Sequence, residues 1–131
     1  MKKILVLLIF LGGFIACNKE NDNIDLIGKW KIDNVSGGLH GNGYTPHFKY
    51  MYLIEDGTCK WTDNEDKLLV NETYVLSTEV GKDYIQFEKM DTPIYSFYTH
   101  KFEYKFLTSD SLYLDEGCAD CYDYTFIRVN K

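Results

Sequence analysis

The chain has 131 residues, which suits one domain, with 14 basic and 20 acidic residues and a formal net charge of −6. Residues 1–16 hold two of the basic residues and no acidic one, so the rest of the chain carries −8. Nucleic-acid binding needs clustered Lys and Arg, whereas Arg128 is the single arginine. We therefore expect no nucleic-acid partner.

The first 16 residues have the three parts of a secretory signal peptide. Two lysines give a positive start, residues 4–11 are apolar, and two glycines precede the expected cleavage site. The apolar run is too short for a stable membrane span. The motif Phe-Ile-Ala-Cys at residues 14–17 resembles the lipobox of bacterial lipoproteins. This resemblance implies that Cys17 becomes a thioether-linked diacylglycerol and the new N-terminus; the alternative is an ordinary secretory signal followed by an unmodified cysteine.

A lipidated cysteine determines the expected location of the protein. Two or three acyl chains on one residue anchor a protein durably. We expect a membrane-anchored outer-membrane lipoprotein of the bacterial cell envelope, with the periplasmic and cell-surface orientations both open. Residues 17–25 are then the lipidated cysteine and a polar, flexible tether that cannot form a core. The folded domain is expected at residues 26–131.

Alternation of apolar and polar residues dominates the rest of the chain, and no long amphipathic helix is visible. The clearest example is residues 101–106, which place Phe102, Tyr104 and Phe106 on one face and charges on the other. Such stretches are separated by turn-forming residues. The pattern predicts strands at 27–35, 48–54, 58–62, 68–78, 83–88, 95–107, 111–115 and 122–129. Eight short strands at regular spacing predict an all-β fold, either a sandwich or a single antiparallel up-and-down barrel.

The first and last predicted strands carry short motifs. The sequence Gly-x-Trp at Gly28 and Trp30, together with Arg128 in the last strand, resembles the lipocalin (calycin) pattern. Residues 26–129 also resemble the short lipocalin-like domains of Bacteroidetes lipoproteins, which implies an eight-stranded lipocalin-like barrel. In such a meander Trp30 and Arg128 meet at one end, where a guanidinium on an indole would form a barrel-closing pair. The alternative is a chance match, with Arg128 as a surface cation.

The lipocalin resemblance and the alternation together predict a ligand pocket. In lipocalins the ligand enters at the open end, which is here the end opposite Trp30, where the glycine-rich stretch 36–47 is the longest loop. The resemblance therefore implies a small hydrophobic or amphipathic ligand. The candidate pocket residues are Tyr50, Tyr52, Trp61, Tyr74, Phe87, Tyr98, His100, Phe102, Tyr104 and Tyr124, and the same interior should receive Ile32, Phe106, Leu112, Leu114 and Phe126.

A second hypothesis belongs to another class of protein. The same rings could simply fill a small barrel, as eight strands allow. The chain would then be a non-enzymatic structural or interaction module whose loops contact a protein or glycan partner. Tyr44 and Tyr122 are the loop aromatics that such a module would expose.

Besides Cys17, the chain has three cysteines: Cys59, Cys118 and Cys121. In an oxidising envelope, the Cys-x-x-Cys spacing of the last two most simply gives a local disulfide. Cys59 is expected at the other end of a strand, out of their reach, as a buried free thiol. A zinc site that combines Cys118 and Cys121 with His40 and His47 is the alternative. Because one Cys-x-x-Cys and two loop histidines support it weakly, we expect no metal or cofactor.

No sequence motif of a catalytic machinery is present. The chain has no Gly-x-Ser-x-Gly elbow, phosphate-binding loop, His-Glu-x-x-His or dinucleotide fingerprint. A redox role for the Cys-x-x-Cys would need a helix N-terminus to lower a thiol pKa, and no helix is predicted there. We expect a monomeric, non-enzymatic protein whose contacts are the membrane, through its lipid anchor, and a small ligand.

Overall fold

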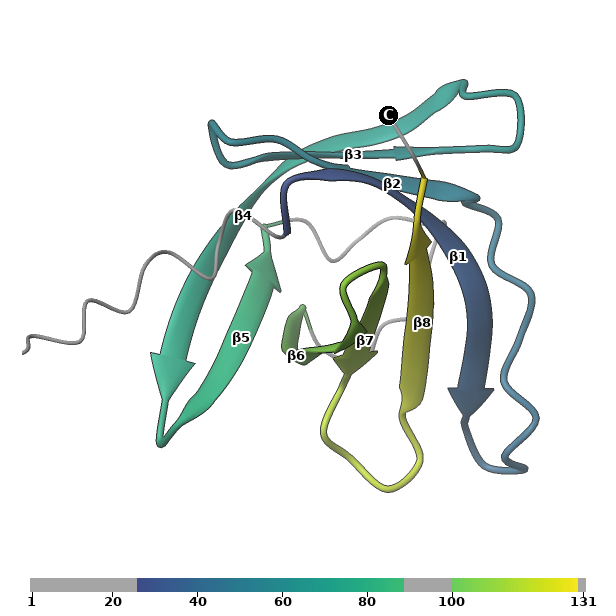
Figure 1. Ribbon diagram of the computed structural model, residues 1–131. Helices are drawn as coiled ribbons and strands as arrows, with labels where there is room; N and C mark the ends of the chain where they lie inside the picture. Colours follow the sequence, from purple (N-terminus) through teal and green to yellow (C-terminus); the bar gives the residue numbers. More distant parts are fainter. Residues whose placement is uncertain (1–25, 89–99, 130–131) are drawn as a thin grey trace, which may run out of the picture.

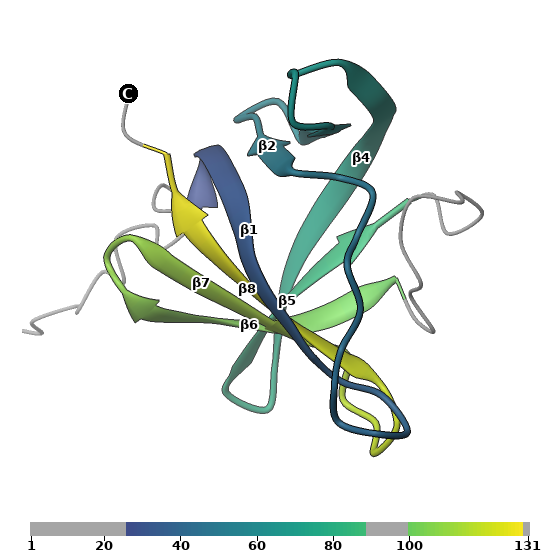
Figure 2. The same ribbon diagram turned by 90° about the vertical axis from the view of Figure 1, so that its right-hand side faces the viewer.

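Eight antiparallel strands form a closed barrel in which each strand pairs with the next in chain order and the last pairs with the first (Figures 1 and 2). The structure, a computed structural model, describes residues 26–88 and 100–129. The prediction of an all-β, up-and-down barrel is confirmed. The strands are β1 (Gly28–Gly37), β2 (Tyr50–Leu53), β3 (Thr58–Thr62), β4 (Leu68–Glu79), β5 (Lys82–Phe87), β6 (Lys101–Thr108), β7 (Ser111–Asp115) and β8 (Tyr122–Arg128).

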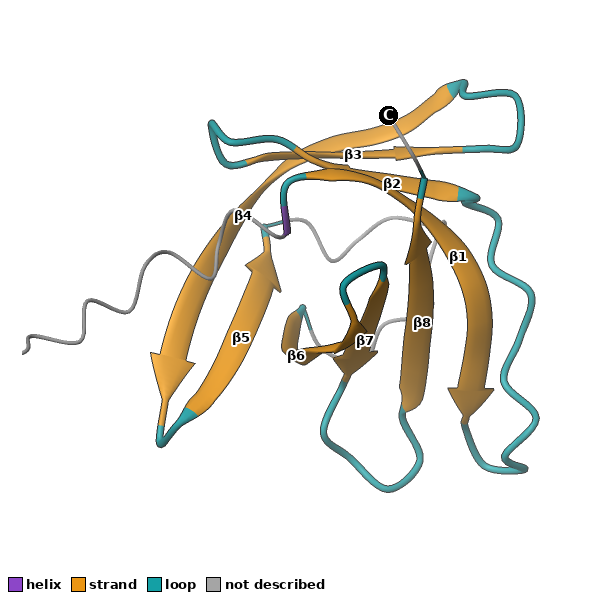
Figure 3. Cartoon of the chain, viewed as in Figure 1, coloured by secondary structure: helices purple, strands orange, loops and turns teal. Residues whose placement is uncertain are grey.

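The predicted strand ranges agree with these bounds to within two residues, with one exception. The strand expected at 95–107 is described only from Lys101, and residues 95–99 lie outside the described part of the chain. Strands and their connecting loops account for almost all of the described residues (Figure 3). Period-two alternation and turn-forming residues are thus sufficient to locate the elements.

The inward face of β2 is the opposite of the one predicted. Met51 and Leu53 are buried, at 0% and 1% exposure, whereas Tyr50 and Tyr52 lie on the outer face. The strand has four residues and is apolar on both faces, so alternation gives no contrast from which to choose. The prediction of Tyr50 and Tyr52 as interior residues is therefore wrong. The neighbouring strands decide the face, since Met51 lies in register with the buried Trp61 of β3.

Strands β1 and β8 close the barrel. Their ladder runs from the pair of Trp30 and Arg128 to the pair of Gly37 and Tyr122. The Arg128 guanidinium carbon lies 4.2 Å from the centroid of the Trp30 ring, which is fully buried. The first indole and the single arginine of the chain therefore meet at one end of the barrel, where the meander places them.

Further contacts hold the Arg128 side chain in place. Its Nη1 donates a hydrogen bond to the Ile27 carbonyl at 3.1 Å, and its Nε lies 3.7 Å from a carboxylate oxygen of Asp110. At Gly28, φ is 143°, and a Cβ there would lie 3.2 Å from Arg128 Nη1. The glycine of the Gly-x-Trp motif thus leaves the guanidinium room to lie over the indole.

The β4–β5 turn offers a test of local backbone strain. Val80 and Gly81 both have positive φ, 50° and 75°, between the paired residues Glu79 and Lys82. Such two-residue turns favour Asn-Gly, and a β-branched residue there is strained. Because the Val80 side chain is fully exposed, Val80→Asn should raise the free energy of unfolding by about 1 kcal/mol in urea titrations. The control is Val75→Asn within β4, which should not stabilise the fold, since strands favour valine; equal stability of Val80→Asn and the unaltered chain would contradict the prediction.

Replacing Arg128 tests the closing pair. Arg128→Ala removes the contact with the indole and the hydrogen bond to Ile27, so we expect a loss of about 2 kcal/mol in unfolding free energy. Arg128→Lys keeps the charge but lacks the planar guanidinium group. It should recover less than half of the stability that Arg128→Ala loses. Lys31→Ala, an exposed neighbour on β1, should change stability very little. A full rescue by lysine would show that charge alone matters.

Candidate functional site

Aromatic rings from several strands meet across the barrel interior. Trp61 of β3, Phe87 of β5, Phe102 of β6, and Tyr124 and Phe126 of β8 are all fully buried. Ring centroids lie 5.3 Å apart for Trp61 and Phe87, 5.9 Å for Phe87 and Phe102, and 6.0 Å for Phe102 and Tyr124. Trp61 and Phe126, from strands on different sides of the barrel, are 6.4 Å apart. These rings, the central ring cluster, occupy the middle of the barrel.

The remaining pocket candidates have different positions. Tyr74 and Tyr104 are buried at inward positions, and the Tyr74 hydroxyl donates to the Ile54 carbonyl at 2.8 Å. His100 is half-buried just before β6, and its carbonyl accepts a main-chain hydrogen bond from β5 at 2.8 Å. Tyr98 lies outside the described residues. The pocket candidates on β3, β4, β5, β6 and β8 therefore do lie together in the barrel, but their rings contact one another.

Phe48 and Glu72 are among the interior residues that the sequence prediction omitted. Phe48, just before β2, is buried, with its ring 4.8 Å from that of Trp61. Glu72 is also buried, and its Oε1 accepts a 2.6 Å hydrogen bond from the Trp61 indole. The alternation of Val70, Glu72 and Tyr74 along β4 was sufficient to find Glu72. Phe48 shares a face with Tyr50 and Tyr52 in the predicted strand 48–54. It is buried although those two are not, because it precedes the regular strand.

Tyr50 and Tyr52 belong to a polar network on the outer face of β1, β2 and β3. The Lys29 ammonium lies 4.0 Å from the Tyr50 ring centroid and 5.1 Å from that of Tyr52. Asp66 accepts hydrogen bonds from Lys29 at 2.8 Å, from Tyr52 at 2.6 Å and from Thr62 at 3.3 Å. The hydrogen bond from Lys29, followed by that from Tyr52, lowers the pKa of the Asp66 carboxyl. These groups satisfy one another outside the barrel.

The β1–β2 loop, residues 38–49, and the β7–β8 loop, residues 116–121, lie side by side at one end of the barrel (Figures 1 and 2). The Gly38 N–H donates to the Cys121 carbonyl at 2.9 Å. At Gly37, φ is 89° and a Cβ would lie 2.3 Å from that carbonyl oxygen, so only glycine fits. We call the surface of these two loops and the adjoining Tyr122 the loop end.

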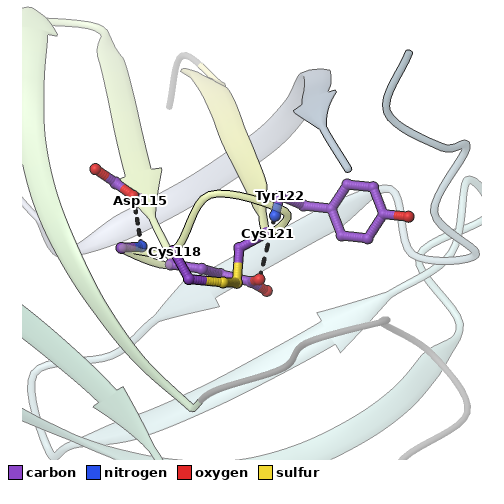
Figure 4. The surroundings of a disulfide bond; sticks show 6 residues. Asp115, Cys118, Cys121 and Tyr122 are labelled. Atoms are coloured by element: carbon purple, nitrogen blue, oxygen red, sulfur yellow. Dashed lines mark hydrogen bonds between the residues drawn. A yellow bond between two sulfur atoms is a disulfide. The ribbon is translucent and has the colours of Figure 1, made fainter. Parts of the chain in front are cut away.

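A disulfide joins Cys118 and Cys121 within the β7–β8 loop, with Cα atoms 5.2 Å apart (Figure 4). The predicted disulfide is confirmed. Cys59 is a buried free thiol, as expected, and burial raises its pKa well above the usual value. Because both sulfurs of the Cys-x-x-Cys are bonded to each other, they are not thiolate ligands for zinc. In the described ranges, no group of three or more His, Cys, Asp or Glu side chains is placed to hold a metal ion.

Two polar contacts brace the disulfide loop (Figure 4). The Gly117 N–H donates to an Asp115 carboxylate oxygen at 2.6 Å. The Tyr122 N–H donates to the buried Glu116 carboxylate at 3.2 Å. The loop therefore presents Tyr122 in a fixed position.

Tyr44 of the β1–β2 loop packs against two tyrosines of β8. Its ring centroid is 4.8 Å from that of Tyr122 and 6.3 Å from that of Tyr124, both edge-to-face. The hydroxyls of Tyr44 and Tyr124 are 3.1 Å apart. Burial, followed by this hydrogen bond, raises the pKa of Tyr124. Tyr44 thereby fastens its loop to the barrel while part of its ring stays exposed.

Two hollows flank the rings of Tyr44 and Tyr122, and Asn42 contributes to both. The larger, of about 420 Å³, lies between β1 and the β1–β2 loop and is lined by Ile32, Asp33, Asn34, Val35, Asn42, Tyr44, Thr45, Pro46, Phe48 and Lys49. The smaller, of about 240 Å³, is lined by Gly37, Gly38, Leu39, His40, Asn42, Gly43 and Tyr122. The loop end is therefore a hollowed surface that contains rings and polar groups.

An acidic row crosses the outer face of β6, β7 and β8. Glu103, Asp115 and Asp123 are cross-strand neighbours. Ion pairs with Lys82 at 2.8 Å and Lys105 at 2.9 Å lower the pKa of Glu103. Burial, with a smaller effect of Asp115, raises the pKa of Asp123.

The chain matches no protein-family model, no curated protein and no solved structure. Within residues 26–88 and 100–129, no helix is long and apolar enough to cross a membrane.

The opposite pKa shifts of Asp123 and Glu103 predict opposite effects of pH on stability. The folded-state pKa of Asp123 lies above the unfolded value of about 3.9, so its contribution to stability is full below that pH and is lost as pH rises through the folded pKa. At about pH 7, Asp123→Asn should therefore unfold at a higher temperature than the unaltered chain, and the difference should shrink towards pH 3.

Glu103 provides the matched comparison. Its folded-state pKa lies below the unfolded value of about 4.3, so its stabilisation is present above that value and is lost as pH falls through the folded pKa. Glu103→Gln should unfold at a lower temperature at about pH 7 and match the unaltered chain near pH 2. Thermal unfolding followed by circular dichroism across this range checks both, and shifts of the same sign for the two variants would refute the assignment.

Proposed function

We propose that this chain is a non-enzymatic lipoprotein of the bacterial outer membrane, tethered through Cys17. Its lipocalin-like barrel is a filled scaffold, and its loop end binds a partner. One observation carries this proposal: the central ring cluster occupies the barrel interior, whereas two hollows, of about 420 and 240 Å³, lie together at the loop end. A third hollow, of about 360 Å³, lies beside Tyr52 and Asp66. Binding residues commonly sit on loops that a rigid scaffold positions.

The alternative function is a container that holds a small hydrophobic ligand inside the barrel. Among the described residues, the ring of Trp61 contacts Phe87 on one side and Phe126 on another. A ligand in the middle of the barrel would have to displace these rings, at a cost of several kcal/mol for lost packing. The packed interior therefore favours the scaffold function over the container function.

The position of the expected anchor supports the same arrangement. The domain begins at Leu26, beside the closing pair, and β1 then runs ten residues to the loop end. Ten strand residues span about 33 Å. A lipid on Cys17 would therefore be attached through the tether at the end with Trp30 and Arg128, opposite the loop end.

Lipidation is tested on the full chain isolated from bacterial membranes. We expect an intact mass that corresponds to a chain beginning at Cys17 and carrying diacylglycerol. The variant Cys17→Ser should lose the lipid mass and leave the membrane fraction, while its circular dichroism spectrum stays that of a β-barrel. Retention of Cys17→Ser in the membrane without a lipid would contradict the proposed tether.

Partner binding is tested by a photo-crosslinking amino acid placed at one of two exposed positions. Leu39 lies at the loop end and Val75 lies on β4. In intact cells, position 39 should give one dominant adduct that excess unaltered chain competes away, and position 75 should not. Native mass spectrometry of the full chain provides the opposing result: an apolar molecule retained at one copy per chain and released only on unfolding would favour the container.

A further inference from the structure

We propose that the larger hollow at the loop end binds a neutral saccharide of one or two sugar rings. This inference rests on the proposed function and names the ligand class of the same surface. The hollow has a volume of about 420 Å³, within the range of about 300–1,000 Å³ that small-molecule sites occupy.

Backbone contacts close the hollow at both ends. At one end the Ile32 N–H donates to the Lys49 carbonyl at 3.0 Å, and at the other the Gly43 N–H donates to the Gly37 carbonyl at 3.0 Å. The four residues of β1 between these contacts, 33–36, span about 13 Å. An extended peptide adding to the edge of β1 would have to continue past one of these contacts. The closed ends therefore favour a compact ring ligand over an extended chain.

The accessible lining of the hollow is mostly polar. Ile32, Val35 and Phe48 also border the hollow, but their side chains belong to the barrel core and are almost fully buried. The exposed members of the lining are polar: Asp33, Asn34, Asn42 and Thr45. A sugar ring has an apolar C–H face and a rim of hydroxyls, each of which both donates and accepts. Amide and hydroxyl side chains also do both, so the two surfaces are complementary.

The charges of the lining favour a neutral ligand. Asp33 and Lys49 both contribute to the hollow with opposite signs. An anionic ligand would meet the Asp33 carboxylate and a cationic ligand the Lys49 ammonium, whereas a ligand of hydroxyls can hydrogen bond to both.

Tyr44 provides a wall that is already in position. Its ring is fixed by edge-to-face contact with Tyr122 at 4.8 Å and by its hydroxyl, 3.1 Å from that of Tyr124. A ring that is immobile before binding loses little conformational entropy when a ligand packs on it. Tyrosine also combines an apolar face with a polar tip, which suits the mixed surface of a sugar.

The experiment uses the full lipidated chain in detergent micelles and saturation-transfer NMR. The probes are neutral disaccharides of glucose, galactose, mannose and N-acetylglucosamine, and a tetra-alanine peptide. We expect at least one disaccharide to bind. Asn34→Ala should weaken binding roughly five-fold through loss of a hydrogen bond. Thr45→Trp should abolish it by filling the hollow, and Asn64→Ala, an exposed asparagine on the β3–β4 turn that does not line the hollow, should leave it unchanged.

Thermal unfolding of each variant confirms that it folds. Absence of binding by every disaccharide, or binding that Thr45→Trp leaves intact, would overturn the saccharide proposal. Binding of the peptide alone, blocked by Thr45→Trp, would also overturn it. If the crosslink at position 39 is nevertheless specific, the proposed function stands and only the ligand class fails; if that crosslink is also absent, both fail.

Discussion

The contact of Trp61 with rings from different walls of the barrel is the constraint on which the rest of the structure depends. A closed barrel of eight strands has an interior wide enough either for its own side chains or for one small ligand. Here Trp61, Phe87 and Phe126 take up that width, and Phe48 adds a further ring from outside the strands. With the middle of the barrel occupied, the hollows at the loop end are where we propose that a partner binds. Barrels with this strand order can enclose a ligand, but here aromatic side chains occupy the interior.

The two ends of this scaffold are finished by different chemistry. At one end Arg128 lies on Trp30 and hydrogen bonds to the chain just before β1, so the first and last strands are held together there. At the other end, glycine at position 37 allows the β1–β2 and β7–β8 loops to approach within hydrogen-bond distance. The disulfide of Cys118 and Cys121 fixes the β7–β8 loop. The first arrangement stabilises the fold, and the second shapes a surface with two hollows.

Much of this arrangement is predictable from sequence because local rules govern it. Period-two alternation and turn residues locate the strands, strand order brings Trp30 to Arg128, and the short spacing of Cys118 and Cys121 gives their disulfide. The sequence prediction fails where the local pattern does not distinguish one face of a strand from the other. Alternation alone predicts Tyr50 and Tyr52 inward, but both faces of β2 are apolar, and only the neighbouring strands decide which face is buried. The hollows are formed by the path of a loop past the edge of β1, which depends on tertiary contacts that no periodicity encodes.

The filled interior is the central claim, and the indole N–H of Trp61, which donates to Glu72 inside the barrel, reports on it most directly. Palmitic acid and a hydrophobic naphthalene sulfonate dye can be titrated into the Cys17→Ser chain while the Trp61 indole resonance is followed by NMR. A packed barrel predicts that this resonance does not move as either probe is added. A saturable shift of the Trp61 signal would mean that an apolar ligand enters the barrel, and would contradict the account.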